Sequence, residues 1–256
     1  MNDPEVILTV HAGVAAITLN RPHRKNAITG PLADELADAF ERVSRRDDVH
    51  VVLLSGTGGG FCSGLDTVEY NADPTPTWLA TSTESLLAAH LAIFDCPVPV
   101  VGALEGFAIN GGAAFALACD LLVVGETAFL QVGEIRQGMA APMNLAWLLA
   151  RYPASVATQI VLTGRRFTGP DLHRLGVALD VVPDTEVLDS ARRLAVDIAT
   201  WPTPNVENLK DAIRDLARGQ KPAQDPAAGR EWFNRALTSV LFSARSEFLP
   251  RPVGEE

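Results

Sequence analysis

The stretch "GFAINGGAAFALACD", Gly106 to Asp120, carries the densest structural signal in the chain. A run that reads as a buried strand, "PVPVVGALEG" (Pro97 to Gly106), leads into it, and Gly111 and Gly112 then open an alanine-rich helix. The first N–H groups of a helix lack intrahelical acceptors, and the helix dipole adds positive potential there. Glycines at that point let a ligand oxygen approach these donors. The alternative is that they only allow close packing of helix on strand.

Strands and helices alternate around that stretch. The apolar patterns predict strands in 6–20 (two strands around an Ala-Gly turn), 50–56, 98–103 and 120–124, and helices from Pro31 onward and over 83–95 and 111–118. This alternation predicts an α/β fold with mostly parallel sheets.

The end of the chain differs, because from about Thr185 its apolar residues follow helical spacing only. Three stripes fall in 187–198, 206–216 and 232–244, and "WPTP" (Trp201 to Pro204) marks a boundary between the first two. The last stripe has more large apolar residues than a small helical tail can bury, which favours subunit association. Packing back onto its own domain is the alternative.

Composition excludes several classes of function. The 256 residues carry a net charge of −10 without a long Lys/Arg run, which disfavours nucleic-acid binding. Three cysteines without CxxC spacing indicate neither a zinc site nor a disulfide framework. The sequence predicts no metal and no secretory signal. It also predicts no membrane span, since no apolar run reaches the ~18 residues that cross a bilayer. We therefore expect a cytoplasmic location.

A second glycine-rich turn, "GTGGGFCSGLD", follows the strand expected at 50–56. It fails the dinucleotide-binding fingerprint, because Phe61 stands where the third glycine belongs, and it lacks the Lys-Ser/Thr of a phosphate-binding loop. Its functional interpretation is an exposed backbone N–H between Ser63 and Leu65. The alternative is a plain turn.

Four motifs together resemble the crotonase superfamily, the enoyl-CoA hydratase/isomerase family. They are "LNRPHRKNAI" (Leu19 to Ile28), "GFCSGLD" (Gly60 to Asp66), "GFAINGGAAFALACD" and "FLQVGEIRQGM" (Phe129 to Met139). The resemblance implies a ClpP-like spiral of β-β-α units over residues 1–200 and a helical oligomerisation region over 201–256. It also implies acyl-CoA thioester substrates, no cofactor apart from the coenzyme A of the substrate, and a homotrimer or dimer of trimers.

The resemblance further implies where the site lies. The backbone N–H groups of Leu65 and Gly111 would form an oxyanion hole for the thioester carbonyl, and such donors are typically worth about 3–4 kcal/mol each. Glu134 would be the acid–base group, with Arg24 and Lys25 near the phosphates of the coenzyme. The positions expected to contact the substrate are Arg24, Lys25, Asn26, Ala27, Ser63, Gly64, Asp66, Gly112, Ala114 and Arg251.

The departures from the family pattern bear on the reaction. Hydratases of this family carry two glutamates, and the position of one of them is Ala114 here, whereas the other is present as Glu134. Gly133 replaces the usual proline, and "AAPMN" (Ala140 to Asn144) replaces the usual "PGxGG". Hydration needs both a base for water and an acid for carbon, whereas one carboxylate can shuttle a proton during double-bond migration. The residues therefore favour 3-enoyl to 2-enoyl isomerisation over hydration.

Three alternatives remain open. The first is a hydratase with an unrecognised second acid, for which Asp66, Asp120, His90 and Tyr70 are the candidates, Tyr70 through its hydroxyl. The second is a non-catalytic acyl-CoA-binding protein. The third is a specialised crotonase that acts on a bulky or aromatic acyl-CoA.

Overall fold

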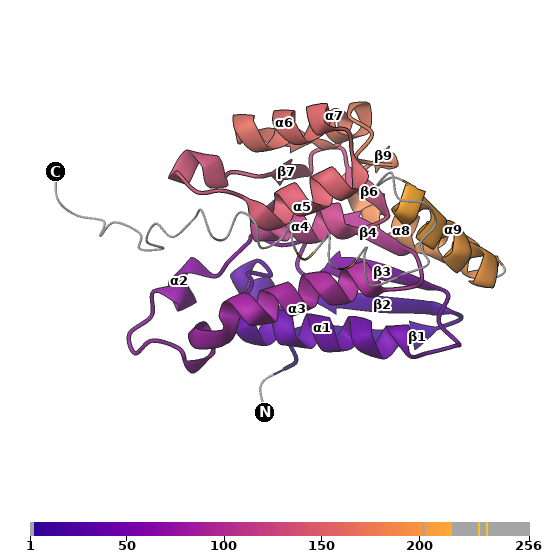
Figure 1. Cartoon of the computed structure of the whole chain (residues 1–256), viewed down its shortest axis with the longest axis horizontal. Coiled ribbons are helices and arrows are strands. Elements are labelled where there is room, and N and C mark those ends of the chain that lie inside the picture. The colour runs from indigo at the N-terminus through magenta and orange to yellow at the C-terminus, as the bar shows by residue number, and fades with distance from the viewer. Residues whose placement is uncertain (1–2, 202, 217–229, 231–233, 235–256) are drawn as a thin grey trace.

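The structure, a computed structural model, describes residues 3–201, 203–216, 230 and 234 of the chain. Its strands form a six-stranded sheet in the order β1-β2-β3-β4-β6-β9 and a three-stranded sheet in the order β5-β7-β8 (Figure 1). The strands are Val6–His11 (β1), Val14–Leu19 (β2), Val51–Gly56 (β3), Val100–Leu104 (β4), Phe107–Ile109 (β5), Leu121–Gly125 (β6), Phe129–Gln131 (β7), Arg166–Thr168 (β8) and Asp180–Val182 (β9). The helices are Gly30–Ser44 (α1), Thr67–Tyr70 (α2), Ser82–Asp95 (α3), Gly111–Ala118 (α4), Pro142–Arg151 (α5), Ala154–Thr163 (α6), Gly169–Arg174 (α7), Val187–Ala199 (α8) and Thr203–Leu216 (α9).

Local sequence explains how the first sheet begins. β1 and β2 pair antiparallel around Ala12 and Gly13, both with positive φ, as a tight hairpin turn requires. From β2 onward the large sheet is parallel. α1 begins after Thr29, whose hydroxyl accepts a hydrogen bond from the N–H of Leu32 at 3.1 Å, with Pro31 in its first turn.

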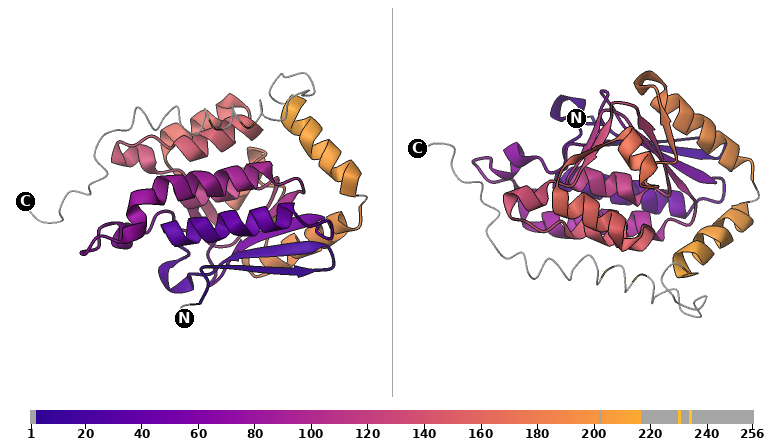
Figure 2. Two further views of the ribbon diagram at one scale, coloured as in Figure 1. Left: turned by 60° about the horizontal axis from the view of Figure 1, so that its bottom comes forward. Right: turned by 90° about the horizontal axis from the view of Figure 1, so that it is seen from above.

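The large sheet lies between two layers of helices (Figure 2). The larger core lies on the side of α1, α3, α4 and α5, where α1 packs against α3 and α4 against α5. The smaller core lies between the sheet and α8. The apolar stripe of α1 and that of α8 both face inward, as their helical spacing predicts. The α/β prediction is confirmed.

The small sheet positions the site. β5 and β7 pair in parallel, with Ile109 opposite Gln131. α4 begins two residues after β5, and Glu134 follows β7 by three residues. Because parallel strands point the same way, both segments emerge from the same edge of this sheet.

The C-terminal region is described in part. The boundary expected at Trp201 to Pro204 falls between α8 and α9, but the division into 1–200 and 201–256 stays a prediction. α9 is attached to the rest of the chain: Lys210 donates to the carbonyl of Val98 at 2.8 Å, and Arg214 to that of Phe94 at 3.0 Å. The stripe expected in 232–244 lies outside the described residues, apart from Asn234. Within the described part, no helix is both long and apolar enough to cross a membrane.

Candidate active site

Two backbone N–H groups that lack an acceptor in the described part of the chain occur where the glycine-rich turn meets the start of α4. Among the described residues, neither the N–H of Leu65 nor that of Gly111 has a hydrogen-bond acceptor. The turn lies along β5, because Phe107 accepts bonds from the N–H groups of Phe61 and Cys62, and the N–H of Ile109 donates to Cys62. The segment ending at Leu65 is thereby held beside the residues that lead into Gly111.

Gly64 shows how close this approach is. Its φ is +88°, and a Cβ on it would lie 2.8 Å from the carbonyl oxygen of Ile109 and 3.5 Å from the nitrogen of Gly111. A side chain would therefore strain the backbone, collide with the Ile109 carbonyl and crowd the nitrogen of Gly111. Gly112 has a packing role, because a Cβ there would collide with the carbonyl oxygen of Cys62. Both interpretations of the glycine pair, access to a donor and close packing, thus have a place in the structure.

Asn110 connects the start of α4 to the segment that carries Glu134. Its backbone is left-handed, with φ +52°, and its side-chain oxygen accepts the N–H of Gly133 at 2.8 Å. Its own N–H donates to the carbonyl of Gln131, also at 2.8 Å. Gly111 and Glu134 are therefore each one residue beyond a directly bonded pair.

Glu134 has a largely buried carboxyl group, and one of its two oxygens has no hydrogen-bond partner among the described residues. Oε1 accepts a hydrogen bond from Nδ2 of Asn144 at 3.0 Å. Oε2 is buried and has no partner in the described part of the chain. Burial raises the pKa of Glu134 from 4.5 to about 7, because desolvation disfavours the charged form, although bonds from its own backbone N–H and from Asn144 oppose the rise. A carboxyl in this state can both take and return a proton near neutral pH.

Ala114 lies one turn into α4, where its N–H donates to the carbonyl of Asn110 at 3.1 Å. It is completely buried and apolar.

Asp120, one of the candidates for a second acid, is bound to Arg151 and Lys210, each at 2.8 Å. Asp120 also accepts the N–H of Val100, and these contacts occupy its carboxylate.

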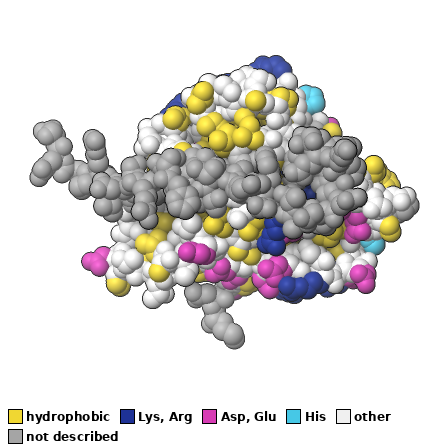
Figure 3. All heavy atoms as spheres, in the orientation of Figure 1, with side chains coloured by type: hydrophobic (Ala, Val, Ile, Leu, Met, Phe, Trp, Pro, Cys, Tyr) yellow, Lys and Arg dark blue, Asp and Glu magenta, His cyan; other side chains and the backbone are white. Residues whose placement is uncertain are grey.

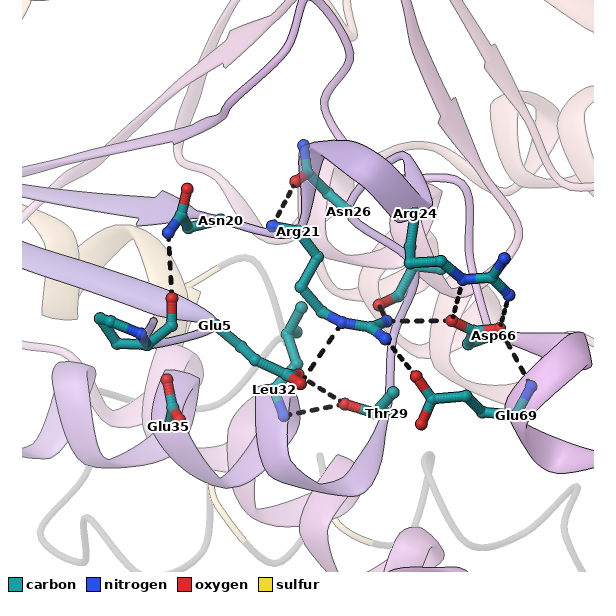
Figure 4. A network of polar contacts seen from close by, with 12 residues as sticks. Glu5, Asn20, Arg21, Arg24, Asn26, Thr29, Leu32, Glu35, Asp66 and Glu69 are labelled. Carbon is teal, nitrogen blue, oxygen red and sulfur yellow. Dashed lines mark hydrogen bonds and ion pairs between the residues drawn. The ribbon is translucent and has the colours of Figure 1, made fainter. Parts of the chain in front are cut away.

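Asp66 is likewise engaged in a network of charges (Figure 4). Arg24 binds both of its oxygens, at 2.5 and 3.0 Å, and Arg21 binds one at 3.1 Å. Although burial would raise the pKa of Asp66, these hydrogen bonds and that of the Glu69 N–H hold it at about 2. Arg21 also contacts Glu69 and Glu5. Asp66 is therefore an ionised anchor of the segment that carries Leu65.

The "RPHRKNA" loop is attached to the same turn. Asn26 is fully buried and donates to the carbonyls of Thr57 and Gly60 at 2.9 and 2.8 Å. The carbonyl of Ala27 accepts Nη1 of Arg21 at 2.6 Å, and that of Lys25 accepts the N–H of Ser63 at 3.1 Å. This loop therefore supports the turn that carries Leu65.

The expected contacts with coenzyme A stay predictions. Lys25 is exposed, whereas about a third of the Arg24 side chain is accessible and its guanidinium is paired with Asp66. Arg251 lies outside the described residues. No cluster of three or more His, Cys, Asp or Glu side chains suited to a metal occurs in the described ranges.

The two remaining candidates for a second acid are engaged in aromatic packing. His90 is fully buried, accepts the Nε1–H of Trp147 at 2.9 Å and stacks on Phe115 at 4.9 Å. Burial lowers its pKa to about 3, so His90 is neutral and part of the core. Tyr70 packs edge-on against Trp78, with 5.2 Å between ring centres.

Sequence reasoning missed Arg21, Asn110 and Asn144. The sequence pattern places Arg21 in a motif but gives no sign that it is buried. Asn144 lies in the segment that departs from the family pattern, and only the fold brings it to Glu134.

Comparison with known proteins agrees with this geometry. The family model described as enoyl-CoA hydratase/isomerase matches residues 9–238. The chain is 34% identical over 256 residues to the 1,2-epoxyphenylacetyl-CoA isomerase of Escherichia coli K12, covering 94% of this chain and 97% of that protein. It is 35% identical over 208 residues to a probable enoyl-CoA hydratase of Mycobacterium bovis, covering 78% and 73%.

Solved structures show the same fold. The carnitinyl-CoA hydratase of Mycobacterium avium superposes with a TM-score of 0.80 at 28% identity, covering 96% of this chain and 92% of that one. The prediction of a crotonase-type α/β fold is therefore confirmed. The chain belongs to the enoyl-CoA hydratase/isomerase family of the crotonase superfamily, and it is an acyl-CoA-processing enzyme of that family.

Proposed function

We propose that the enzyme converts a 3-enoyl-CoA into the conjugated 2-enoyl-CoA, with Glu134 as its single acid–base group. The proposal rests on the carboxyl group of Glu134. This group is largely buried, one of its oxygens has no partner among the described residues, and its pKa is raised to about 7. At the second acid position of the family, Ala114 offers no proton-transfer group.

The reaction follows from these groups. The Glu134 carboxylate removes a proton from C2 of the 3-enoyl thioester, and the electron pair moves into a dienolate. The negative charge develops on the thioester oxygen, beside the N–H groups of Leu65 and Gly111, each worth about 3–4 kcal/mol to such an oxyanion. The protonated Glu134 then delivers the same proton to C4, the double bond settles between C2 and C3, and the carboxylate is restored. Hydration would need a second group to activate water.

The test is a spectroscopic assay with two substrates. The ultraviolet band of the conjugated thioester should grow when 3-enoyl-CoA is offered and hardly fall when 2-enoyl-CoA is offered. Glu134→Gln should abolish the growth while still binding the ester. A rapid fall with 2-enoyl-CoA would contradict the proposal and indicate a hydratase with another acid.

A second candidate is isomerisation of an aromatic acyl-CoA. The observation that favours it is the match, over nearly the full length of both proteins, to a 1,2-epoxyphenylacetyl-CoA isomerase. A carboxyl with a pKa of about 7 is partly protonated at neutral pH and can donate a proton to a leaving oxygen. Offering the epoxide ester beside 3-enoyl-CoA, and comparing kcat/KM, decides between the two.

We also propose that the enzyme is a homotrimer or a dimer of trimers. Hydrophobic side chains gather on the upper part of the face in Figure 3, the side where α6 lies in Figure 1. Leu162 of α6 is 66% exposed and Leu149 of α5 is 47% exposed. A contiguous exposed apolar patch favours association between subunits. Light scattering after gel filtration should give three or six times 27.3 kDa, whereas a monomer would contradict the proposal.

A cytoplasmic location is proposed as well. Its support is that Cys62, Cys96 and Cys119 are unpaired and buried, as in proteins of reducing compartments. Fractionation of the source cells tests it.

A further inference from the structure

The side-chain amide of Asn144 contacts both Glu134 and the carbonyl of Asn110, the residue before Gly111. Asn144, the third residue of α5, is 2% exposed, and its Nδ2 donates to Oε1 of Glu134 at 3.0 Å and to the carbonyl of Asn110 at 3.1 Å. A carbonyl and a carboxylate accept but do not donate, so the amide must turn its NH₂ group toward them.

We propose that Asn144 is a positioning residue that couples the base to the oxyanion donor, an inference that rests on the proposed function of this site. The carbonyl of Asn110 and the N–H of Gly111 belong to one planar peptide group. A hydrogen bond to that carbonyl therefore also fixes the direction of the N–H, which lies in the same plane and points the opposite way. It also polarises the peptide, which strengthens the N–H as a donor.

On the other side, Asn144 fixes the carboxyl of Glu134. It holds Oε1 and leaves Oε2, which has no partner among the described residues, to exchange the proton. Its second proton goes to the Asn110 peptide, so a shift of α5 would move the base and the oxyanion donor together. The relative placement of these two groups is what an enolate-forming site must keep constant.

The other atom of the amide argues against a purely structural role. Oδ1 of Asn144 is buried and lacks a donor in the described part of the chain. An unsatisfied buried acceptor is destabilising, so this amide is not arranged for maximum stability. Its Nδ2 group donates two hydrogen bonds, and both acceptors, the Glu134 carboxyl and the Asn110 carbonyl, belong to the site.

The experiment compares three variants on α5. Asn144→Leu removes the donor at similar volume, and Asn144→Asp keeps the shape but presents a carboxylate to Glu134. Leu148→Ala, at a fully buried position of the same helix, controls for loss of packing. In both Asn144 variants kcat for 3-enoyl-CoA should fall about 10- to 100-fold, with KM changed less than about threefold.

The pH profile separates positioning from general damage. The Asn144 contact lowers the pKa of Glu134, so its removal should move the rising limb of kcat/KM to higher pH. Leu148→Ala should leave the limb in place. A fall in kcat with an unmoved limb in both Asn144 variants would overturn the proposal.

A titration without substrate distinguishes this proposal from the proposed function. The Glu134 carboxyl is followed by carbon-13 NMR and assigned by its absence in Glu134→Gln. An inactive wild-type enzyme would refute the isomerase proposal. A titration that moves upward in Asn144→Leu or Asn144→Asp would then still support the coupling, and one unchanged in both would overturn it.

Discussion

The side-chain oxygen of Asn110 accepts a hydrogen bond from the backbone N–H of Gly133 at 2.8 Å. This contact joins the residue before Gly111, the proposed oxyanion donor, to the residue before Glu134, the proposed base. The parallel pairing of β5 with β7 aligns the same two segments, with Ile109 opposite Gln131. The strand pairing and this side-chain contact therefore both restrain the separation of Gly111 and Glu134, which should change little between free and substrate-bound enzyme.

The contact predicts a difference between two variants of Asn110. Asn110→Gly and Asn110→Ala both remove the side-chain oxygen, and both should lower kcat. Both replacements must keep a φ of about +52°, which strains alanine but not glycine, so Asn110→Ala should be less stable than Asn110→Gly by about 1–2 kcal/mol. Urea unfolding of both variants measures this. Equal stabilities would show that the backbone relaxes.

Glu134 predicts the pH dependence of activity. Its carboxylate form starts the reaction, and its pKa is about 7, so kcat/KM should rise with pH up to about that value. Glu134→Gln should reduce kcat by about 10²–10⁴ at every pH. A profile that is flat between pH 5 and 8 would contradict the assignment of Glu134 as the base.

The same residue predicts a pH-dependent cost in stability. Because its pKa is higher in the folded state, its contribution is most favourable below pH 4.5 and is lost as pH rises through about 7. The change corresponds to about 3 kcal/mol. Glu134→Gln, which cannot ionise, should therefore gain stability relative to wild type between pH 4.5 and 8. Glu186→Gln, at an exposed position, controls for the loss of one negative charge.

Asp66 predicts the opposite pH dependence. Its pKa is held at about 2, so its contribution is present above pH 3.8 and is lost as pH falls toward 2. Asp66→Asn leaves Arg21, which is 4% exposed, without this partner and should cost about 3 kcal/mol. Because Asp66 follows Leu65, kcat should fall as well. Thermal unfolding and the isomerase assay on one preparation measure the loss of stability and the loss of kcat. An unchanged kcat would show that the charge network around Asp66 does not affect the proposed oxyanion donor at Leu65.

The sequence predicted the elements that have a clear period. α4 was expected at 111–118 and lies there, and Leu32, Leu36 and Phe40 are buried as the spacing of α1 predicted. The strands β5, β7, β8 and β9 have three residues each, too few for a period to be visible. The helices α5, α6 and α7 were not predicted either.

The site was predictable only as far as its motifs reach. Leu65, Gly111 and Glu134 lie in recognisable segments, and the structure brings these segments together. The hydrogen bonds of Asn110 and Asn144 depend on how β5, β7 and α5 meet, which adjacent residues do not encode. The role of Arg21 likewise depends on its contact with Asp66, which lies far along the chain.

Isotope tracing follows the proton that Glu134 is proposed to carry from C2 to C4. A 3-enoyl-CoA deuterated at C2 is converted in ordinary water, and the 2-enoyl product is analysed by mass spectrometry and NMR. Transfer by Glu134 alone predicts that a substantial share of the deuterium appears at C4, since the carboxyl is buried. Complete loss to solvent of the deuterium removed from C2, or a 3-hydroxyacyl product, would show that Glu134 does not transfer this proton alone.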